Sequence, residues 1–263
     1  MKPLLRRLIP VEFQPRSDLP RTVLAKLGYF RFRTWLANGG KSIPDIGLYR
    51  PLFSPWGGLP DFERFYTLAR PNTLVSRERC YVLWQTLKQS MRLNGEFLEC
   101  GVFRGGTALL AAHAIAEYLP PAEQAGRKLH LFDSFQGMPP DTTSAERFSP
   151  GDFARTSVEA VSKLLSPYPN VSLHPGFIPD TFSGLDIKTI AWAHVDVDLH
   201  QSVRDCIDWI YPRLSAGGYM IFDDYGFPSC PGARRAVDDA FADKPEIPLC
   251  LPTGQCMVVK LPT

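Results

Sequence analysis

The sequence has no surplus of charge of one sign. It carries 29 lysine and arginine residues against 27 aspartate and glutamate residues, which gives a formal net charge of +2. A protein that attracts nucleic acid or an anionic membrane through its overall field needs a stronger basic surplus. We therefore expect a small-molecule partner, and we expect neither nucleic acid nor a membrane to bind.

Long apolar runs are also missing. No segment approaches the roughly 20 apolar residues of a membrane-spanning helix. The apolar stretch within residues 1–13, MKPLLRRLIPVEF, is interrupted by arginine and proline and lacks the cleavage site of a signal peptide. The six cysteines form no CxxC pair and lack the dense spacing of a disulfide framework. These features predict reduced thiols in a cytoplasmic protein.

Regular sequence patterns begin near residue 76. A chain of 263 residues with 44% hydrophobic content suffices for one large domain with a buried core. Residues 1–75 are rich in proline and arginine over most of their length and show no clear period. We predict that they form an N-terminal extension of the same domain, either wrapped on the body or lying at a subunit interface. Residues 76–263 would form the main domain.

Strand and helix patterns alternate through this main domain. The predicted strands cover residues 97–100, 129–133, 171–176, 189–198 and 218–224, and the predicted helices cover residues 76–92, 107–118, 156–167, 202–214 and 232–241. This alternation specifies an α/β fold with a mostly parallel, doubly wound sheet. Two further β patterns within residues 247–261 are joined by Pro252, Thr253 and Gly254, which predicts an antiparallel C-terminal hairpin and a seven-stranded sheet.

The segment FLECGVFRGGT, residues 97–107, places an acid and three glycines between a strand and a helix. Open α/β sheets bind ligands beyond the carboxyl ends of their strands, where glycines let the ligand approach the backbone. A phosphate loop would end in GK[ST], and a dinucleotide fingerprint would have glycine at Phe103. A cationic ligand suits Glu99 better. We therefore interpret the turn as a site for S-adenosylmethionine, with Glu99 on its ammonium and Asp133 on its ribose hydroxyls. The alternative is that Glu99 only caps a turn and that Asp133 only starts the loop DSFQGMPP.

Two further stretches, HVDVD and FDDYG, place acids at the ends of two more strands. Asp196, Asp223 and Asp224 would lie on neighbouring strands about 5 Å apart, so that a proton or a cation must lie among them. Oxygen ligands favour Mg²⁺, whereas zinc prefers histidine or cysteine. Asp198 would then be free to act as a base. In the structural alternative, Asp198 caps the next helix and Asp224 forms a turn. We expect His194 to be a packed core residue.

Six motifs follow one another along the chain in the order found in one known family. They are FLECGVFRGGT, LFDSFQGMPP, GFIPDTF, HVDVDLHQS, LSAGGYMIFDDYG and GARRAVDDAF. The sequence from about residue 73 to residue 260 resembles the macrocin O-methyltransferase family. This resemblance implies a class I S-adenosylmethionine-dependent methyltransferase domain, with a Rossmann-like fold, over residues 76–263. It also implies a Mg²⁺-dependent enzyme that methylates a sugar hydroxyl of a glycosylated small molecule or natural product, usually as a homo-oligomer.

The resemblance further implies roles for individual residues. Asp198 matches the general base, and His200, where the family commonly has tyrosine, is expected to orient Asp198 or to touch the acceptor. The implied metal ligands are Asp196, Asp223 and Asp224. The implied cofactor residues are Thr73, Ser76, Glu99, Gly101, Val102, Thr107, Asp133, Ser134, Gly176 and Asp196.

Other functions are open at this point. A Mg²⁺-dependent catechol-type O-methyltransferase would use the same metal to hold a diol on an aromatic ring. A non-catalytic module that binds S-adenosylmethionine would keep the nucleoside pocket, although it would not require four acids. A nicotinamide-dependent reductase is disfavoured by Phe103, which replaces a fingerprint glycine.

Overall fold

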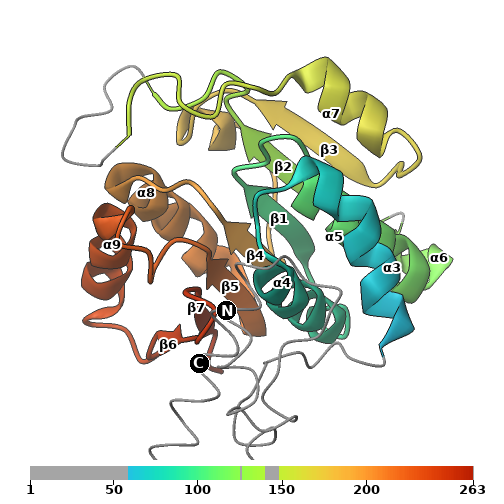
Figure 1. Ribbon diagram of the computed structural model, residues 1–263. Coiled ribbons are helices and arrows are strands. Elements are labelled where there is room, and N and C mark those ends of the chain that lie inside the picture. Colours follow the sequence, from blue (N-terminus) through green and yellow to red (C-terminus); the bar gives the residue numbers. More distant parts are fainter. Residues whose placement is uncertain (1–58, 125, 140–147, 263) are drawn as a thin grey trace, which may run out of the picture. The chain divides into compact units, whose positions relative to one another are not determined.

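A seven-stranded sheet lies at the centre of the computed structural model (Figure 1), which describes residues 59–124, 126–139 and 148–262. The strand order is β3-β2-β1-β4-β5-β7-β6. The strands are β1 (Glu96–Cys100), β2 (Leu129–Asp133), β3 (Val171–Pro175), β4 (Ile190–Val195), β5 (Leu214–Phe222), β6 (Leu249–Cys250) and β7 (Cys256–Val259).

Strands β1 to β5 pair in parallel, whereas β7 runs antiparallel to both β5 and β6. The predicted parallel sheet that ends in an antiparallel C-terminal pair is therefore confirmed. The hairpin places β7, the last strand in the sequence, directly beside β5, which carries two of the predicted metal ligands at its end.

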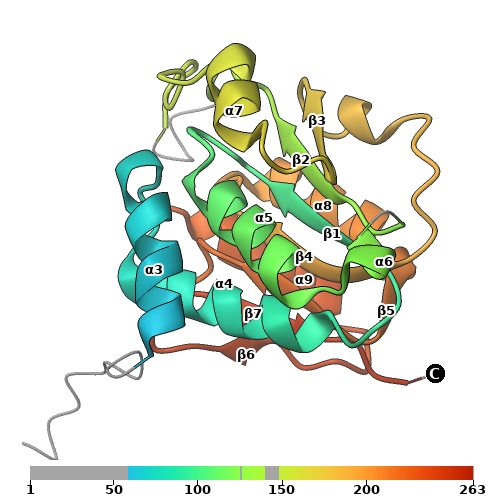
Figure 2. The ribbon, with the colours of Figure 1, turned by 90° about the vertical axis from the view of Figure 1, so that its right-hand side faces the viewer.

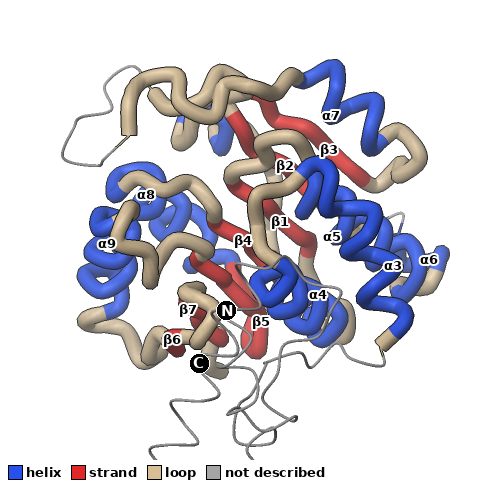
Figure 3. The backbone as a smooth tube through the Cα atoms, viewed as in Figure 1, coloured by secondary structure: helices blue, strands red, loops and turns tan. Residues whose placement is uncertain are grey.

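Helices cover both faces of the sheet (Figures 1 and 2). The helices are α3 (Pro60–Ala69), α4 (Arg77–Ser90), α5 (Gly106–Tyr118), α6 (Pro121–Gln124), α7 (Val158–Leu165), α8 (His200–Ile210) and α9 (Pro231–Phe241). Short 3₁₀ turns are η2 (Arg70–Asn72), η4 (Asp180–Phe182) and η5 (Tyr211–Arg213). Figure 3 shows the long loops that join these elements above the strand ends. Helices α3, α4 and α5 contribute to one apolar core, and α8 and α9 contribute to the other.

Helix α3 is not predicted by the sequence patterns, because residues 60–69 continue a segment rich in proline. In the structure, Phe62 and Phe65 of this helix are fully buried in the core that α4 and α5 share. Residues Trp56–Thr263 form one compact unit. Residues 1–58, most of the predicted extension, lie outside the described part of the chain.

Two glycines of the predicted turn are required by close packing. A Cβ on Gly101 would lie 1.8 Å from the carbonyl oxygen of Asp196, so that the ends of β1 and β4 can meet only at a glycine. A Cβ on Gly106 would lie 2.6 Å from Thr73. The turn thus brings three predicted site segments together: the one after β1, the one after β4 and the one around Thr73.

The connection from β3 to β4 contains the 3₁₀ turn η4 and no α-helix. Phe182 of this turn stacks on Trp209 of α8, with the ring centroids 4.5 Å apart. The turn thereby covers part of the sheet face that the missing helix would cover. Within the described ranges, no helix is both long and apolar enough to cross a lipid bilayer.

Candidate active site

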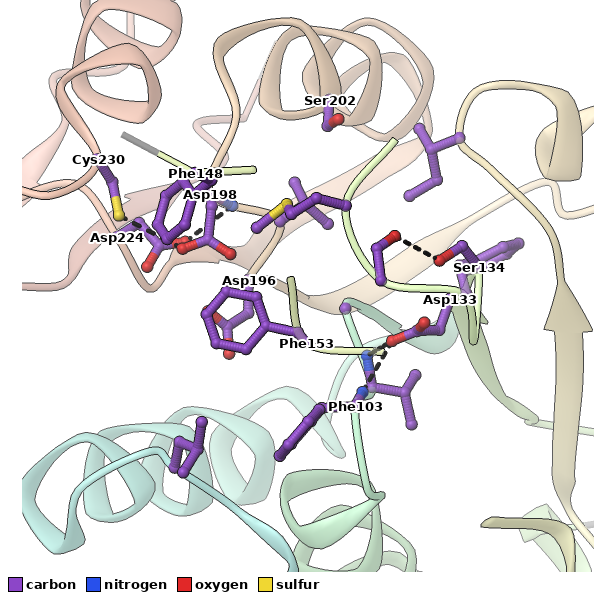
Figure 4. Close-up of a pocket in the computed structure, with 18 of the residues that line it drawn as sticks. Phe103, Asp133, Ser134, Phe148, Phe153, Asp196, Asp198, Ser202, Asp224 and Cys230 are labelled. Atoms are coloured by element: carbon purple, nitrogen blue, oxygen red, sulfur yellow. Dashed lines mark hydrogen bonds between the residues drawn. The ribbon is translucent and has the colours of Figure 1, made fainter. Parts of the chain in front are cut away.

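A cavity of about 370 Å³ opens at the carboxyl ends of the parallel strands (Figure 4). This is the edge where open α/β sheets bind ligands, and the volume is typical of a small-molecule site. The residues that line it follow β1, β2, β3, β4 and β5, and also come from the segment before α4. Segments far apart in the sequence therefore contribute to one site.

Most of the predicted site residues line this cavity. They are Thr73, Gly101, Val102, Thr107, Asp133, Ser134, Gly176, Asp196, Asp198 and Asp224. Four predicted residues are not part of the lining. Glu99 and Asp223 are fully buried behind it, His200 is the first residue of α8, and Ser76 is the exposed N-cap of α4.

The carboxylate of Asp133 holds two turns in place. Its Oδ2 accepts the backbone N–H groups of Val102 and Phe103, each at 2.7 Å, and its Oδ1 accepts the N–H of Phe135 at 2.6 Å. Hydrogen bonds to an ionised acceptor are stronger than those between neutral groups. Asp133 therefore fixes the backbone after β1 as well as lining the cavity.

Glu99 belongs to a buried chain of polar side chains behind the cavity. Its Oε1 accepts the hydroxyl of Thr107 and lies 3.1 Å from Nδ1 of His194. The other ring nitrogen of His194 lies 3.4 Å from Oδ1 of Asp223. His194 is buried, as the sequence predicts, and it also bridges two acids. Oε2 of Glu99 is buried and has no hydrogen-bond partner in the described part of the chain, so it has the capacity to accept a hydrogen bond from a cation.

Both carboxylate oxygens of Asp223 have partners. Its Oδ1 accepts the side-chain amide of Gln255 at 2.8 Å, and its Oδ2 is ion-paired with Arg79. Arg79 begins in the first turn of α4 and reaches across to the end of β5. The pattern of the sequence gives no sign of this ion pair, because its partners are 144 residues apart.

Asp198 lies between Asp224 and Cys230 at the other end of the cavity (Figure 4). Its φ of 55° is in the left-handed region, which disfavours residues with a side chain. The N-cap of α8 is Leu199, and no side chain caps this helix. Asp198 therefore does not cap α8, so this part of the structural alternative is wrong.

Burial raises the pKa of three acids in the cavity, which are Asp196, Asp198 and Asp224. The pKa of Asp198 is raised to about 7, first by burial and then by the neighbouring charge of Asp224. Burial and the charge of Asp224 also raise the pKa of Asp196, and burial raises that of Asp224. Carboxylates this close and this far from water favour either a proton or a cation among them.

Among the residues that the structure describes, two groups of side chains bring possible ligand atoms within 4.8 Å of one another. One contains His194, Asp196 and Asp223, and the other contains Asp198, Asp224 and Cys230. Two of the predicted metal ligands, Asp196 and Asp223, are thus in one group, and the third, Asp224, is in the other. Asp223 is also paired with Arg79. Asp196 and Asp224 both line the cavity, and their carboxylate oxygens are ligands of the kind that Mg²⁺ prefers.

Three phenylalanine rings form an apolar wall beside these acids, which we call the aromatic wall: Phe103, Phe148 and Phe153 (Figure 4). The centroids of Phe103 and Phe153 are 6.1 Å apart, and those of Phe148 and Phe153 are 5.8 Å apart. Phe103 and Phe153 both have a positive φ. Sequence reasoning missed the wall, since isolated aromatic residues in loops carry no periodic signal. Phe153 remains 41% exposed, so the wall can receive a ligand.

Comparison with known proteins identifies a family. A family model described as macrocin O-methyltransferase (TylF) matches residues 68–251. The chain is 28% identical to mycinamicin III 3''-O-methyltransferase of Micromonospora griseorubida over 200 residues, which are 70% of this chain and 76% of the relative. It is 30% identical to 8-demethyl-8-(2,3-dimethoxy-alpha-L-rhamnosyl)-tetracenomycin-C 4'-O-methyltransferase of Streptomyces olivaceus over 159 residues, which are 55% of this chain and 57% of the relative.

The solved structure of the O-methyltransferase NovP is similar in fold. The two structures have a TM-score of 0.64 and 26% sequence identity, and the match covers 73% of this chain and 83% of NovP. The sheet order and the antiparallel C-terminal pair described above are those of a class I methyltransferase. From the extent of the family match, the chain belongs to the macrocin O-methyltransferase (TylF) family and is an O-methyltransferase.

Proposed function

We propose that this O-methyltransferase transfers the methyl group of S-adenosylmethionine to a sugar hydroxyl of a glycosylated small molecule, with Mg²⁺ at the acidic end of the cavity. The observation that carries the proposal is the position of Asp196, Asp198 and Asp224 in one cavity with the glycine turn after β1. The proposed cofactor residues and the acids with raised pKa values thus line one cavity.

The residues at the other end of the cavity, and Glu99 buried behind them, fit the cofactor. Oε2 of Glu99, which has no hydrogen-bond partner among the described residues, would accept a charge-assisted hydrogen bond from an ammonium group that reached it. A carboxylate offers about four lone-pair sites, so Asp133 can accept ribose hydroxyls in addition to its three backbone N–H donors. Gly101 and Gly176 also line the cavity, after β1 and β3.

Asp196 and Asp224 would hold the metal, and Asp223 would join them if it parted from Arg79. The oxygen donors of Asp196 and Asp224 and the raised pKa values of these two acids both fit a hard divalent cation. When bound there, Mg²⁺ supplies Lewis-acid polarisation of the acceptor hydroxyl.

Asp198 is placed to take the proton of the acceptor hydroxyl. A pKa of about 7 suits a general base near neutral pH, since it is then partly ionised and still basic. The acceptor oxygen forms a bond to the methyl carbon while the bond from that carbon to sulfur breaks. The proton ends on Asp198, and S-adenosylhomocysteine leaves with the electron pair of the broken bond.

The aromatic wall supports a sugar as the acceptor. Sugar rings have an apolar face of C–H groups, and an apolar wall beside the acids would bury that face while the hydroxyls point to Asp198. The name of the Streptomyces olivaceus relative specifies a rhamnosyl acceptor, which supports the same class.

Calorimetry and an acceptor assay test this function. The protein is titrated with S-adenosylhomocysteine and then with Mg²⁺, and both should bind. Methyl transfer from labelled S-adenosylmethionine is then compared between neutral glycosides and a simple catechol, with and without EDTA. We expect transfer to a glycoside and its loss in EDTA. Transfer to the catechol alone would contradict the sugar acceptor, and full activity in EDTA would contradict the metal.

A further inference from the structure

Arg79 is the one basic side chain among the described residues that line the cavity. Its guanidinium is ion-paired with the fully buried Asp223, and the Arg79 side chain is itself only 15% exposed. A buried carboxylate needs a partner, because an unpaired buried charge is strongly unfavourable. Arg79 thus supplies the positive charge that Asp223 requires.

Arg79 also contacts the segments on either side of the acids. Its Nη2 donates to the carbonyl of Leu74 at 3.2 Å, next to the predicted cofactor residue Thr73. Its guanidinium carbon lies 5.0 Å from the ring centroid of Phe227, in the loop after β5. The side-chain amide of Gln255 lies 3.5 Å from the carbonyl of Arg79 and donates at 2.8 Å to Asp223. Arg79 therefore joins the cofactor side, the acid side and the C-terminal hairpin.

The charged side chain of Arg79 lines the same cavity as Asp196, Asp198 and Asp224. In charge and in place, the guanidinium does what a bound divalent cation would do for the same carboxylates. A cation that binds Asp223 must therefore compete with a group that already occupies one of its oxygens.

We propose that Arg79 is a built-in counter-cation that holds Asp223 in the metal-free protein, and that Mg²⁺ displaces it from Asp223 on binding. This inference rests on the metal site of the proposed function. Because Arg79 also contacts Leu74 and Phe227, its displacement links metal binding to the segments on both sides of the cavity. The arginine lowers the affinity for Mg²⁺ and, in exchange, keeps the site folded without the metal.

The test uses Arg79→Met, which keeps a long apolar side chain and removes the charge. Mg²⁺ alone is titrated by calorimetry into protein saturated with S-adenosylhomocysteine, at pH 8. We expect Arg79→Met to bind Mg²⁺ about 10-fold more tightly than the wild type, or better, because the competitor and its charge are gone. Arg79→Lys keeps the charge and should bind Mg²⁺ much as the wild type does.

Two further variants serve as controls. Arg204→Met removes an exposed arginine whose partner Asp208 is 2.9 Å away on the same helix, and it should leave the affinity unchanged. Asp223→Asn removes a proposed ligand and should weaken the binding of Mg²⁺, which shows that the heat comes from this site. If Arg79→Met does not fold, Arg79→Gln is measured in its place, with the same expected gain in affinity.

The outcomes separate the two proposals. If the wild type binds Mg²⁺ and Arg79→Met binds it more tightly, the counter-cation is supported. If Arg79→Met binds Mg²⁺ and the wild type does not, the displacement is wrong, because the arginine then excludes the metal. If the wild type binds Mg²⁺ and Arg79→Met binds it equally or more weakly, the counter-cation is wrong and the metal site stands. If neither protein binds Mg²⁺, both are wrong.

Thermal unfolding gives an independent readout. In EDTA, Arg79→Met should unfold at a lower temperature than the wild type. In saturating Mg²⁺, this difference in unfolding temperature should be smaller. A gap that is unchanged by Mg²⁺ would mean that the arginine has only a structural role, and would overturn the inference.

Discussion

The thiol of Cys230 donates a hydrogen bond to the carboxylate of Asp198, with 3.3 Å between Sγ and Oδ1. The backbone N–H of Asp198 donates in turn to Oδ2 of Asp224 at 3.1 Å. Asp198 is thus fixed at its side chain and at its backbone, in a left-handed conformation that a residue with a side chain rarely adopts. Such strain is retained where the surrounding structure enforces it, and it is most frequent at active sites.

The first prediction concerns this residue. Asp198→Asn nearly keeps the shape of the side chain but cannot accept the proton of the acceptor. The rate of methyl transfer should therefore fall by about 10²- to 10⁴-fold, the usual loss for a general base. Single-turnover methyl transfer measures the rate, and calorimetry should show that S-adenosylhomocysteine and Mg²⁺ still bind. A variant as fast as the wild type would remove Asp198 from the chemistry.

Asp133→Ala should weaken the binding of S-adenosylhomocysteine by roughly 10- to 150-fold, as expected for the loss of one charge-assisted hydrogen bond. Two causes act together: the ribose loses a partner, and the N–H groups of Val102 and Phe103 lose theirs. The variant should also unfold at a lower temperature. Calorimetry measures the affinity and thermal unfolding the stability. Unchanged affinity would show that Asp133 contributes to the backbone only.

Glu99→Gln should discriminate between two ligands. If the unpartnered Oε2 of Glu99 receives the ammonium of the cofactor, the variant should lose affinity for S-adenosylhomocysteine. It should keep its affinity for 5'-methylthioadenosine, which has the nucleoside but no amino acid moiety. Calorimetric titration with each ligand makes the comparison. Equal losses for both ligands would mean that Glu99 supports the whole cavity and not the ammonium.

His174 gives a pH dependence away from the active site. This residue of β3 lies 2.9 Å from His130, and burial together with the charge of that neighbour lowers its pKa from 6.5 to about 4. Between pH 6.5 and about pH 4, His174 is therefore protonated in the unfolded chain but not in the folded chain. Folding stability should fall as the pH decreases across this window.

The measurement is thermal unfolding of the wild type and of His174→Gln at a series of pH values. The variant should lose less stability than the wild type between pH 6.5 and pH 4, because glutamine at this position binds no proton in the unfolded chain. Parallel curves for the two proteins would show that other groups cause the loss in acid.

The sheet could be predicted because its signals are local and regular. Apolar strands alternate with helices from residue 97 onward, and the turn around Gly254 marks the hairpin. Helix α3 could not be predicted in the same way. Its two phenylalanines are buried against α4 and α5, and this burial is a property of the tertiary structure, not of the local sequence.

The site was predictable only in part, for a related reason. Residues at the ends of parallel strands must meet at one edge of the sheet, so Asp133, Asp196 and Asp224 could be assigned to one cavity in advance. The hydrogen-bond and ion-pair partners of each acid could not be predicted from the sequence. The side chain of Arg79 comes from a helix and that of Gln255 from a hairpin, and no spacing in the sequence connects either of them to Asp223.

The hydrogen bond from Gln255 to Asp223 has a consequence for how the site is assembled during synthesis. The chain is made from its N-terminus, so Arg79, Glu99 and the four aspartates are all made before β7. A nascent chain that has reached α9 therefore carries every acid of the cavity but lacks the amide that holds Asp223 at 2.8 Å, and it lacks the strand that covers the outer edge of β5. The β7 strand completes the sheet and the site in one step, so the site cannot be fully ordered before the fold is closed.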